Sequence, residues 1–308
     1  SWLSFNERVL QEASSRDVPV IQQVRYLGIF SNNMDEFFRV RVADVRRLAA
    51  FSTGEDKDAA RALLKQIQSR VRELQQKFDE VYRGCLIALR RRNIYLINEQ
   101  QLRADQSAFV ERYFRDNVLP ELSPLFLKGS TQLPELNDAS IYFAIRMALT
   151  NGKVQYALLE IPTDRIDRFV YIPPKGSRRK KAIIVLDNII RHCLKEVFRG
   201  VLDIEDAQAY TIKITRDAEL EMDEKITQSL IDKVDGSLAR RKKADPVRFV
   251  YDSEMPEDLL EILAKRFNLG KYDSFIAGGR YHNSKDFMKF PNLGPDYLEF
   301  DPMEPARL

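Results

Sequence analysis

Apolar residues near the start of the chain recur every three or four positions, the spacing that places side chains on one face of an α-helix. One such stripe consists of Ile21, Val24, Leu27, Gly28, Phe38, Val42 and Val45. Because a surface helix buries one apolar stripe against its own domain, we expect this stripe to face the core. A second stripe lies on the opposite side and consists of Tyr26, Ile29, Phe30, Asn33, Phe37 and Val40. Two apolar faces predict two packing partners for this helix.

Asn33 lies in the middle of the second stripe, within the triplet Ser31-Asn32-Asn33. Ser and Asn are poor helix formers, because their side chains compete for backbone hydrogen bonds. Where the local preference of a segment conflicts with its overall pattern, the conflict often marks a functional site. The sequence therefore indicates that the surface around Asn33 does more than pack.

The rest of residues 1–93 also predicts helices. Ser4 and Glu7 have the spacing of a capping box, so we expect a first helix with Ser4 as its N-cap. After Gly54 a third helix carries apolar residues alternately four and three positions apart, namely Leu64, Ile67, Val71, Leu74, Phe78, Val81 and Cys85. Such a heptad stripe suits antiparallel packing on the second helix. We therefore predict an antiparallel helical bundle for residues 1–93.

Residues 94–308 show a different pattern, in which short β-rich runs mix irregularly with helical stripes. Strands are predicted at residues 94–97, 140–149, 154–161, 169–172, 183–186, 209–214 and 247–251. Asn151-Gly152 predicts a hairpin turn, because both residues accept positive φ. Helical stripes occur at residues 186–198 and 226–238. Since strands and helices do not alternate strictly, we predict an α+β fold class, with a mixed domain after the helical bundle.

Several segments resemble, in the same order, the N-terminal and middle domains of bacterial polyphosphate kinases of the phosphohistidine type. They read SWLSFNERVLQEA, RYLGIFSNNMDEFF, YALLEIP, ITRDAELEMDE, KADPVRFVYD, GGRYHNSKDF and FPNLG. The resemblance implies an enzyme that reversibly transfers the terminal phosphate of ATP to polyphosphate. It also implies that the phosphorylated histidine and the Mg²⁺ site lie in a C-terminal half that nothing here matches.

The resemblance thus predicts a fragment that is inactive alone. Pro295, Pro302 and Pro305 are typical of a linker, which we expect to lead toward the missing catalytic half. Family members associate through the middle domain, so we also expect a homodimer or higher homo-oligomer.

The two histidines of the chain do not suggest a catalytic nucleophile. His192 lies opposite the apolar stripe of its helix, so we expect it to face solvent. His282 follows a Gly-Gly pair and lies near several basic residues. It either anchors its loop through a hydrogen bond or holds a phosphate or another domain. Neither histidine has a convergent partner that would activate it, so we expect no catalytic residue in this chain.

No metal site is expected either. Asp35 and Glu36 are adjacent on a helix and therefore point about 100° apart, too far to chelate one ion unaided. An ion pair between Asp35 and Arg39, one helical turn apart, is the use that we expect for Asp35.

Neither a GxxxxGK[ST] loop nor a GxGxxG segment occurs in the chain, so ATP or ADP must bind in another way. An asparagine amide offers a donor and an acceptor, which suits the edge of an adenine ring. The resemblance places a nucleotide contact at the second Asn of the SNN triplet, which is Asn33. Tyr26 shares its face, and we infer it as a weaker contact. The alternative for Asn33 is a capped kink or a hydrogen bond between helices.

Composition fits a cytoplasmic chain of about two domains. The 308 residues carry a net charge of +3 and no apolar run long enough to span a bilayer. Cys85 and Cys193 both lie on apolar helical stripes, so we expect buried thiols in a reducing compartment. Attachment to the periphery of the inner membrane stays open.

Basic residues cluster at 90–92, 178–181 and 240–243. They form either solvated surface or a path for a polyanion such as polyphosphate. Two other functions therefore stay open: a non-enzymatic polyanion-binding or RNA-binding module, and an assembly scaffold whose second helix face is only an interface. We expect no specific nucleic acid as a partner.

Overall fold

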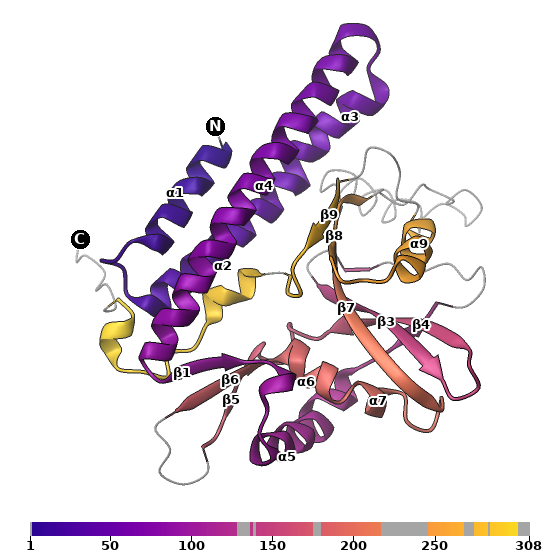
Figure 1. Ribbon diagram of the computed structural model, residues 1–308. Coiled ribbons are helices and arrows are strands. Elements are labelled where there is room, and N and C mark those ends of the chain that lie inside the picture. The colour runs from indigo at the N-terminus through magenta and orange to yellow at the C-terminus, as the bar shows by residue number, and fades with distance from the viewer. Residues whose placement is uncertain are drawn as a thin grey trace, which may run out of the picture.

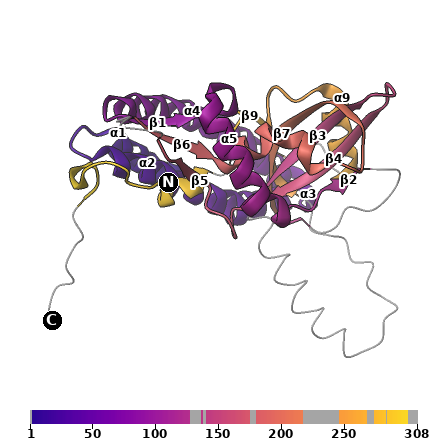
Figure 2. The ribbon, with the colours of Figure 1, turned by 90° about the horizontal axis from the view of Figure 1, so that it is seen from below.

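The computed structural model describes residues 2–127, 136–137, 140–174, 180–216, 246–267, 274–282 and 284–300. It shows a helical N-terminal part beside two β-sheets, which confirms the predicted α+β class (Figure 1). Helix α1 (Trp2–Ser14) and strands β3 (Ile141–Leu149) and β4 (Val154–Ile161) lie at opposite ends of the molecule (Figures 1 and 2).

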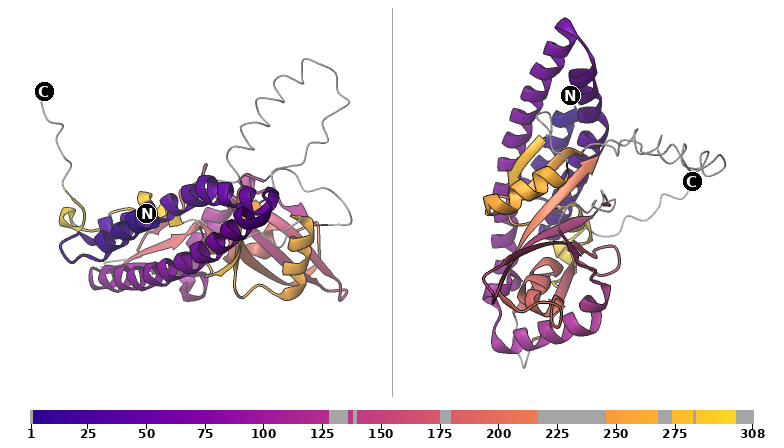
Figure 3. Two further views of the ribbon diagram at one scale, coloured as in Figure 1. Left: turned by 90° about the horizontal axis from the view of Figure 1, so that it is seen from above. Right: turned by 90° about the vertical axis from the view of Figure 1, so that its right-hand side faces the viewer.

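The helical part is built around a long antiparallel hairpin. Helix α2 (Val20–Glu36) continues through a π-helical turn at Phe37–Val42 into α3 (Ala43–Phe51). Helix α4 (Gly54–Arg91) then returns along α3 and α2. The tip of the hairpin, between α3 and α4, stands clear of the sheets (Figures 1 and 3). The predicted heptad stripe of α4 is largely buried, at Leu64, Val71, Leu74, Phe78 and Cys85.

The two apolar faces of α2 have the two partners that the pattern predicts. Ile21, Val24 and Leu27 are buried in the core of the helical part. Helix α1 packs on the other face. Its Trp2 ring stacks on Phe37, which directly follows α2, with ring centroids 5.2 Å apart. The helix stays regular through the Ser-Asn-Asn triplet, and the irregular π-helical turn begins only at Phe37.

The predicted capping box at Ser4 is wrong. Helix α1 already includes Trp2, so Ser4 lies inside it. Burial of Leu3 in the core extends the helix toward the N-terminus past Ser4. Glu7, which we expected to cap the helix, instead forms ion pairs with Arg70 and Lys77 of α4.

The described residues form two sheets. The smaller has the order β1 (Ile94–Ile97), β6 (Lys181–Val185) and β5 (Phe169–Ile172). The larger has the order β2 (Leu125–Phe126), β4, β3, β7 (Ile204–Arg216), β8 (Pro246–Asp252) and β9 (Ser274–Gly278). The pairs β1–β6 and β8–β9 are parallel and the other pairs are antiparallel. This mixture confirms the irregular order of strands and helices seen in the sequence.

The hairpin predicted at Asn151-Gly152 is confirmed, since β3 and β4 pair antiparallel from Ile141↔Ile161 to Ala148↔Val154. The turn chemistry differs in one detail. Gly152 has φ +78°, whereas Asn151 is not among the residues with positive φ. The four-residue connection therefore needs the glycine only at its third position.

Shorter helices accompany the sheets. They are α5 (Ala104–Tyr113), α6 (Leu186–His192), α7 (Leu194–Val197), α9 (Glu257–Arg266), the π-helical turn Phe114–Val118, and the 3₁₀-helices Glu99–Gln101, Leu119–Glu121, η5 (Ser284–Lys289) and Asp296–Leu298. The single helix predicted at residues 186–198 is broken at Cys193. The helix predicted at residues 226–238 lies outside the described residues.

The 3₁₀-helix η5 returns from the sheets to the helical part. It packs on α2 at Gly28, where an added Cβ would lie 2.8 Å from Met288 Cγ. Phe287 of η5 stacks on Tyr82 of α4 with centroids 5.3 Å apart. The buried guanidinium of Arg168 binds Asp187 of α6 at 2.9 Å and Asp286 of η5 at 3.1 Å. Apolar and ionic contacts thus join the two parts of the chain.

Candidate functional site between the helices and the large sheet

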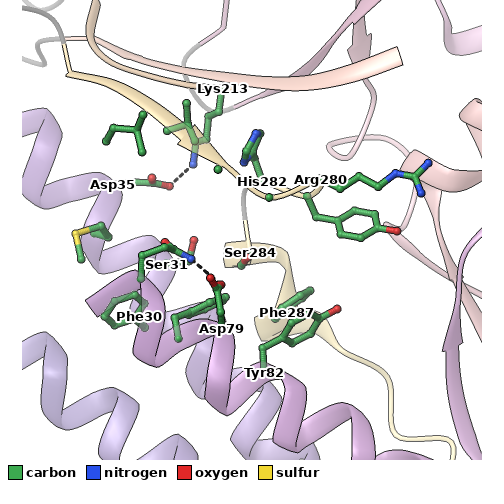
Figure 4. A pocket seen from close by; sticks show the side chains of 18 of the residues that line it. Phe30, Ser31, Asp35, Asp79, Tyr82, Lys213, Arg280, His282, Ser284 and Phe287 are labelled. Atoms are coloured by element: carbon green, nitrogen blue, oxygen red, sulfur yellow. Dashed lines mark hydrogen bonds and ion pairs between the residues drawn. The ribbon is translucent and has the colours of Figure 1, made fainter. Parts of the chain in front are cut away.

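A cavity of about 320 Å³ lies where α2 and α4 face strands β7 to β9 and the segment that leads into η5 (Figure 4). One of its walls is charged and comes from α2 and the sheet. The opposite wall is largely aromatic and comes from α2, α4 and η5. Because both parts of the chain contribute, the cavity depends on how they pack together.

The charged wall centres on Asp35. Its carboxylate accepts a hydrogen bond from Lys213 Nζ of β7 and lies 3.3 Å from Arg248 Nη1 of β8. The expected pair between Asp35 and Arg39 is wrong, because Arg39 lies 4.0 Å from Glu36 instead. Asp35 faces the sheet and pairs with cations from distant parts of the chain. A prediction that considers only neighbours on the same helix cannot identify these partners.

Arg248 is held on two sides. Its guanidinium carbon lies 4.5 Å from the centre of the Phe38 ring, a cation–π contact with the π-helical turn after α2. Burial lowers the pKa of Arg248 below its ordinary value, although the Asp35 carboxylate opposes this. Burial likewise lowers the pKa of Lys213 despite its pairing with Asp35. For both cations, desolvation therefore outweighs the favourable charge of the Asp35 carboxylate.

His282 also lines the cavity, next to this wall, and is 7% exposed (Figure 4). Its Nε2 is 3.1 Å from the carbonyl oxygen of Thr211, so this nitrogen carries the proton and donates. Burial, together with the nearby charges of Arg248 and Lys213, lowers the pKa of His282 to about 3. The imidazole is thus neutral at pH 7. Of the two uses left open for His282, the structure shows the hydrogen bond that anchors the loop.

The aromatic wall is a row of contacting rings. Phe30 lies 5.7 Å from Phe78, Phe78 lies 6.4 Å from Tyr82, and Tyr82 lies 5.3 Å from Phe287. Asp79 belongs to the same side and accepts a hydrogen bond from Gln75 at 3.0 Å. Burial raises the pKa of the Asp79 carboxyl above its ordinary value.

Asn33 and Tyr26 lie on a different face of α2 and do not line this cavity. Both are partly exposed, so Asn33 is not sealed inside the bundle. Asn33 Nδ2 donates to Asn6 Oδ1 of α1 at 3.1 Å. The structure thus shows the hydrogen bond between helices that was the alternative for Asn33, and it leaves part of the side chain open.

The orientation of the Asn33 amide follows from its neighbours. Asn6, which is fully buried, donates its Nδ2 to the Phe30 carbonyl oxygen at 3.1 Å. A carbonyl oxygen only accepts, so Asn6 must offer its own Oδ1 to Asn33. Asn33 must then use its amide nitrogen toward Asn6. Its Oδ1 has no hydrogen bond to any side chain or backbone group in the described part of the chain and remains available as an acceptor.

His192 does not stand free in solvent as expected. Its Nε2 lies 2.8 Å from Ser107 Oγ and 3.5 Å from Glu111 Oε1, both on α5. Neither α5 nor this contact with it was predicted from the sequence. Serine and carboxylate approach the same ring nitrogen, so Glu111 does not hold the opposite nitrogen as the orienting acid of a catalytic triad does.

Both cysteines are free and buried, as expected from their stripes. Burial raises the pKa of each thiol to about 12, so neither is a reactive thiolate at neutral pH. No group of three or more His, Cys, Asp or Glu side chains suited to a metal ion occurs among the described residues. Nor does any helix in that part of the chain have the length and apolar character needed to cross a membrane.

Described residues of two basic clusters lie near each other. Arg90 and Arg91 end α4 and Arg92 follows it, and β1 then pairs with β6 so that Ile94 lies opposite Lys181. Arg92 donates to Tyr297 Oη at 2.8 Å. Residues 178–179 and the cluster at 240–243 lie outside the described residues.

Taken together, the geometry defines an α+β protein in which a helical hairpin is joined to mixed sheets around a charged cavity. Two family models match consecutive parts of the chain. The polyphosphate kinase N-terminal domain matches residues 1–97, and the polyphosphate kinase middle domain matches residues 105–290. The chain therefore belongs to the polyphosphate kinase family and comprises its N-terminal and middle domains.

Individual relatives agree with this assignment. Polyphosphate kinase of Vibrio cholerae is 46% identical over 307 residues, which are 99% of this chain and 44% of that protein. Polyphosphate kinase of Escherichia coli K12 is 43% identical over 309 residues, which are 100% of this chain and 45% of that protein. The crystal structure of polyphosphate kinase from Porphyromonas gingivalis superposes with a TM-score of 0.79 at 29% identity, covering 100% of this chain and 42% of that one. The chain thus spans less than half the length of these relatives.

Proposed function

We propose that this chain forms the adenine-binding and dimerising portion of an enzyme that reversibly transfers the terminal phosphate of ATP to polyphosphate. Membership of the polyphosphate kinase family supports the reaction class. One observation carries the role of this portion: the Asn6 network uses the amide nitrogen of Asn33 and leaves its Oδ1 acceptor without a partner among the described residues, on a partly exposed helix face.

Adenine suits this acceptor. Its exocyclic amine is a hydrogen-bond donor, so it pairs with the free Asn33 oxygen. Guanine and hypoxanthine carry a carbonyl oxygen at the corresponding position, which would meet the Asn33 oxygen acceptor to acceptor. Tyr26 lies seven residues earlier, two turns away on the same face, and its ring offers an apolar surface to the base. The site therefore selects adenine over bases that carry an oxo group.

The phosphate chemistry requires groups that the described residues do not provide. Neither histidine has the geometry of an activated nucleophile, and the acidic residues that the structure describes form no group of three or more suited to a metal ion. We place the phosphorylated histidine and the Mg²⁺ ion outside this chain. It follows that the chain alone binds ATP weakly and does not extend polyphosphate.

The oligomeric state, the cellular location and the partners that we propose are supported by family membership alone. The chain forms a homodimer or a higher homo-oligomer through its middle domain, belongs to a cytoplasmic protein, and has ATP and inorganic polyphosphate as partners. Light scattering tests the oligomeric state, and a monomer would contradict it. Incubation with ATP, Mg²⁺ and polyphosphate tests inactivity, and acid-labile phosphorylation of the chain would contradict that.

Base selectivity is the decisive test of the adenine site. The chain is titrated with ATP and with ITP, which differ at the position that faces Asn33, under calorimetry or by following amide chemical shifts. We expect ATP to bind about tenfold more tightly or better, because an acceptor that meets another acceptor loses a hydrogen bond and leaves two polar groups unsatisfied.

Asn33→Ala should abolish the difference between ATP and ITP. Asn32→Ala is the matched control, because Asn32 is the neighbouring asparagine on the same helix and is also partly exposed. Equal binding of ATP and ITP by the unmodified chain would contradict adenine recognition at Asn33. A steeply salt-dependent response to RNA without a response to ATP would favour the polyanion-binding module instead.

A further inference from the structure

The Nδ1 atom of His282 is an unused hydrogen-bond acceptor at the cavity between α2 and the large sheet. The imidazole lines this cavity from the segment that leads into η5 (Figure 4). Its other ring nitrogen, Nε2, lies 3.1 Å from the carbonyl oxygen of Thr211. A carbonyl oxygen only accepts, so Nε2 carries the proton of the neutral ring and Nδ1 is an acceptor. Within the described part of the chain, no group donates a hydrogen bond to Nδ1.

The surroundings fix this acceptor and keep it neutral. The ring lies against Gly278 of β9, where an added Cβ would be 2.9 Å from His282 Cε1. Although His282 is more than nine-tenths buried, Nδ1 is not one of the polar atoms that packing of the described residues seals off completely. Because the pKa of His282 is lowered to about 3, Nδ1 stays unprotonated at neutral pH. Buried acceptors usually have a partner, so this one points to a donor from outside the chain.

The opposite wall of the cavity suits an aromatic ring. The row of contacting rings formed by Phe30, Phe78, Tyr82 and Phe287 lines it. Aromatic rings pack well on one another in offset and edge-to-face arrangements. A cavity of about 150 Å³ already holds benzene. With about 320 Å³, this cavity has room for a ring with a polar substituent.

The charged side chains of the cavity favour a ligand without net charge. Asp35 is paired with Lys213 and Arg248, and Arg280 is paired with Glu99. An added anion or cation would compete with these ion pairs, whereas a neutral molecule leaves them intact. Apolar walls with a few polar groups that fix orientation are also the usual composition of a small-molecule site.

We propose that this cavity binds a neutral aromatic molecule with a hydroxyl group, whose ring lies on the aromatic wall and whose hydroxyl donates to Nδ1 of His282. Such a ligand contacts α2 and α4 on one side and the segment between β9 and η5 on the other. It therefore strengthens the packing of the helical part on the large sheet. The site is separate from the proposed adenine site, because neither Asn33 nor Tyr26 lines the cavity.

Phenol is the probe for this site, and toluene is its matched control, because a methyl group replaces the hydroxyl at similar size. The chain has only two histidines, so a His192→Gln variant assigns the imidazole nitrogen signals in NMR. We expect phenol to shift the Nδ1 signal of His282 saturably, since this nitrogen accepts a new hydrogen bond. No saturable shift with phenol, or an equal shift with toluene, would overturn the proposal.

Asp79 is the rival acceptor for the hydroxyl. It lines the same cavity and already accepts a hydrogen bond from Gln75 at 3.0 Å. A phenol that donates to Asp79 would shift the signal of the Asp79 carboxyl carbon and leave Nδ1 of His282 unchanged. That result would overturn the assignment of His282 as the recognising group.

Variants add a second measurement. Ser31 lines the cavity from α2, so Ser31→Leu fills part of the space that the ring needs. We expect the affinity for phenol to fall about tenfold or more. Ser69→Leu is the matched control, because Ser69 is an exposed serine of α4 that does not line the cavity. Circular dichroism establishes that both variants fold, and equal affinities in the two variants would overturn the proposal.

Thermal unfolding tests the effect on packing. A ligand that binds only the folded chain raises the midpoint of unfolding as its concentration increases. We expect phenol to raise the midpoint of the unmodified chain and of Ser69→Leu, and to leave that of Ser31→Leu almost unchanged. An equal rise in all three would mean that phenol binds elsewhere, which would overturn the proposal.

This site and the adenine site fail independently. Asn33→Ala removes the discrimination between ATP and ITP and leaves the response of His282 to phenol intact. Ser31→Leu does the reverse. If the chain shows no base selectivity yet phenol still shifts the His282 signal, the adenine proposal alone is overturned.

Discussion

Asp35 on α2 and Lys213 on β7 lie 178 positions apart in the sequence and form an ion pair that fastens the helical part to the large sheet. Their side chains are 19% and 5% exposed, so water screens the pair only weakly. Arg248 joins them at 3.3 Å from the Asp35 carboxylate. The carboxylate between these cations is thus one of the contacts that fix the relative position of the two parts.

Asp35→Asn should destabilise the chain strongly. The variant removes the carboxylate that the buried Arg248 faces and breaks the ion pair with Lys213, and breaking a buried pair by removing one partner costs about 3–5 kcal/mol. The measurement is the free energy of unfolding from urea titration. Glu36→Gln is the control, since Glu36 is the adjacent acid, is 55% exposed and lies 4.0 Å from its partner Arg39. A loss below about 1 kcal/mol for Asp35→Asn would contradict this role for the pair.

Gly28→Ala should also destabilise the chain, for a steric reason. The added methyl would meet the backbone of Met288 and lie 2.8 Å from Met288 Cγ, where η5 crosses α2. Overpacking of this kind costs about 1–3 kcal/mol. Gly84→Ala on α4 meets nothing within 4 Å, so it should stabilise the helix by up to about 1 kcal/mol. Thermal unfolding measures the change in stability of each variant, which we expect to be a loss for Gly28→Ala and a gain for Gly84→Ala. Stabilisation by Gly28→Ala would show that η5 does not pack closely there.

Local patterns predicted much of this fold. The spacing of apolar residues on α4 and the Gly152 turn each depend on neighbours a few positions apart, and both features were confirmed. The break in the predicted helix at Cys193 was missed, because its apolar stripe continues through the break. The helix α5, which contacts His192, was also missed.

The cavity could not be predicted, because its groups meet only after folding. Lys213 and Arg248 each lie within an apolar strand, and a charged residue in such a run was the one available signal. Their common partner, Asp35, lies on a helix near the N-terminus. The spacing of residues within that helix predicted Arg39 as the partner of Asp35 instead. For Asn33 the resemblance indicated the residue, whereas the orientation of its amide required the position of Asn6 on α1.

His282 should make stability depend on pH below neutrality. Its pKa is about 3 in the folded chain and about 6.5 when unfolded, so the unfolded chain binds more protons between these values. Stability therefore falls as the pH decreases through this window. From pH 7.5 to pH 5.5 the contribution of His282 amounts to a loss of about 1.4 kcal/mol. Urea titrations at both pH values should show that His282→Gln, which keeps a donor for Thr211, removes this loss; an unchanged pH dependence would mean that His282 protonates in the folded state.

Asn6 should control nucleotide recognition although it is fully buried and touches no nucleotide in the proposed site. In Asn6→Ala the Asn33 amide loses the acceptor at 3.1 Å that fixes its orientation, so it can rotate and present either its oxygen or its nitrogen. We expect the affinities for ATP and ITP to become nearly equal. We also expect a loss of about 1–3 kcal/mol in stability, because the Phe30 carbonyl loses its hydrogen-bond donor and a small cavity remains. Asn6→Asp offers Asn33 the same acceptor and should retain more of the base preference, even though it loses the donor to Phe30 and so also destabilises the chain. Competition titrations of the two variants separate the effects, because a role in stability alone would leave the ratio of ATP to ITP affinity unchanged in both.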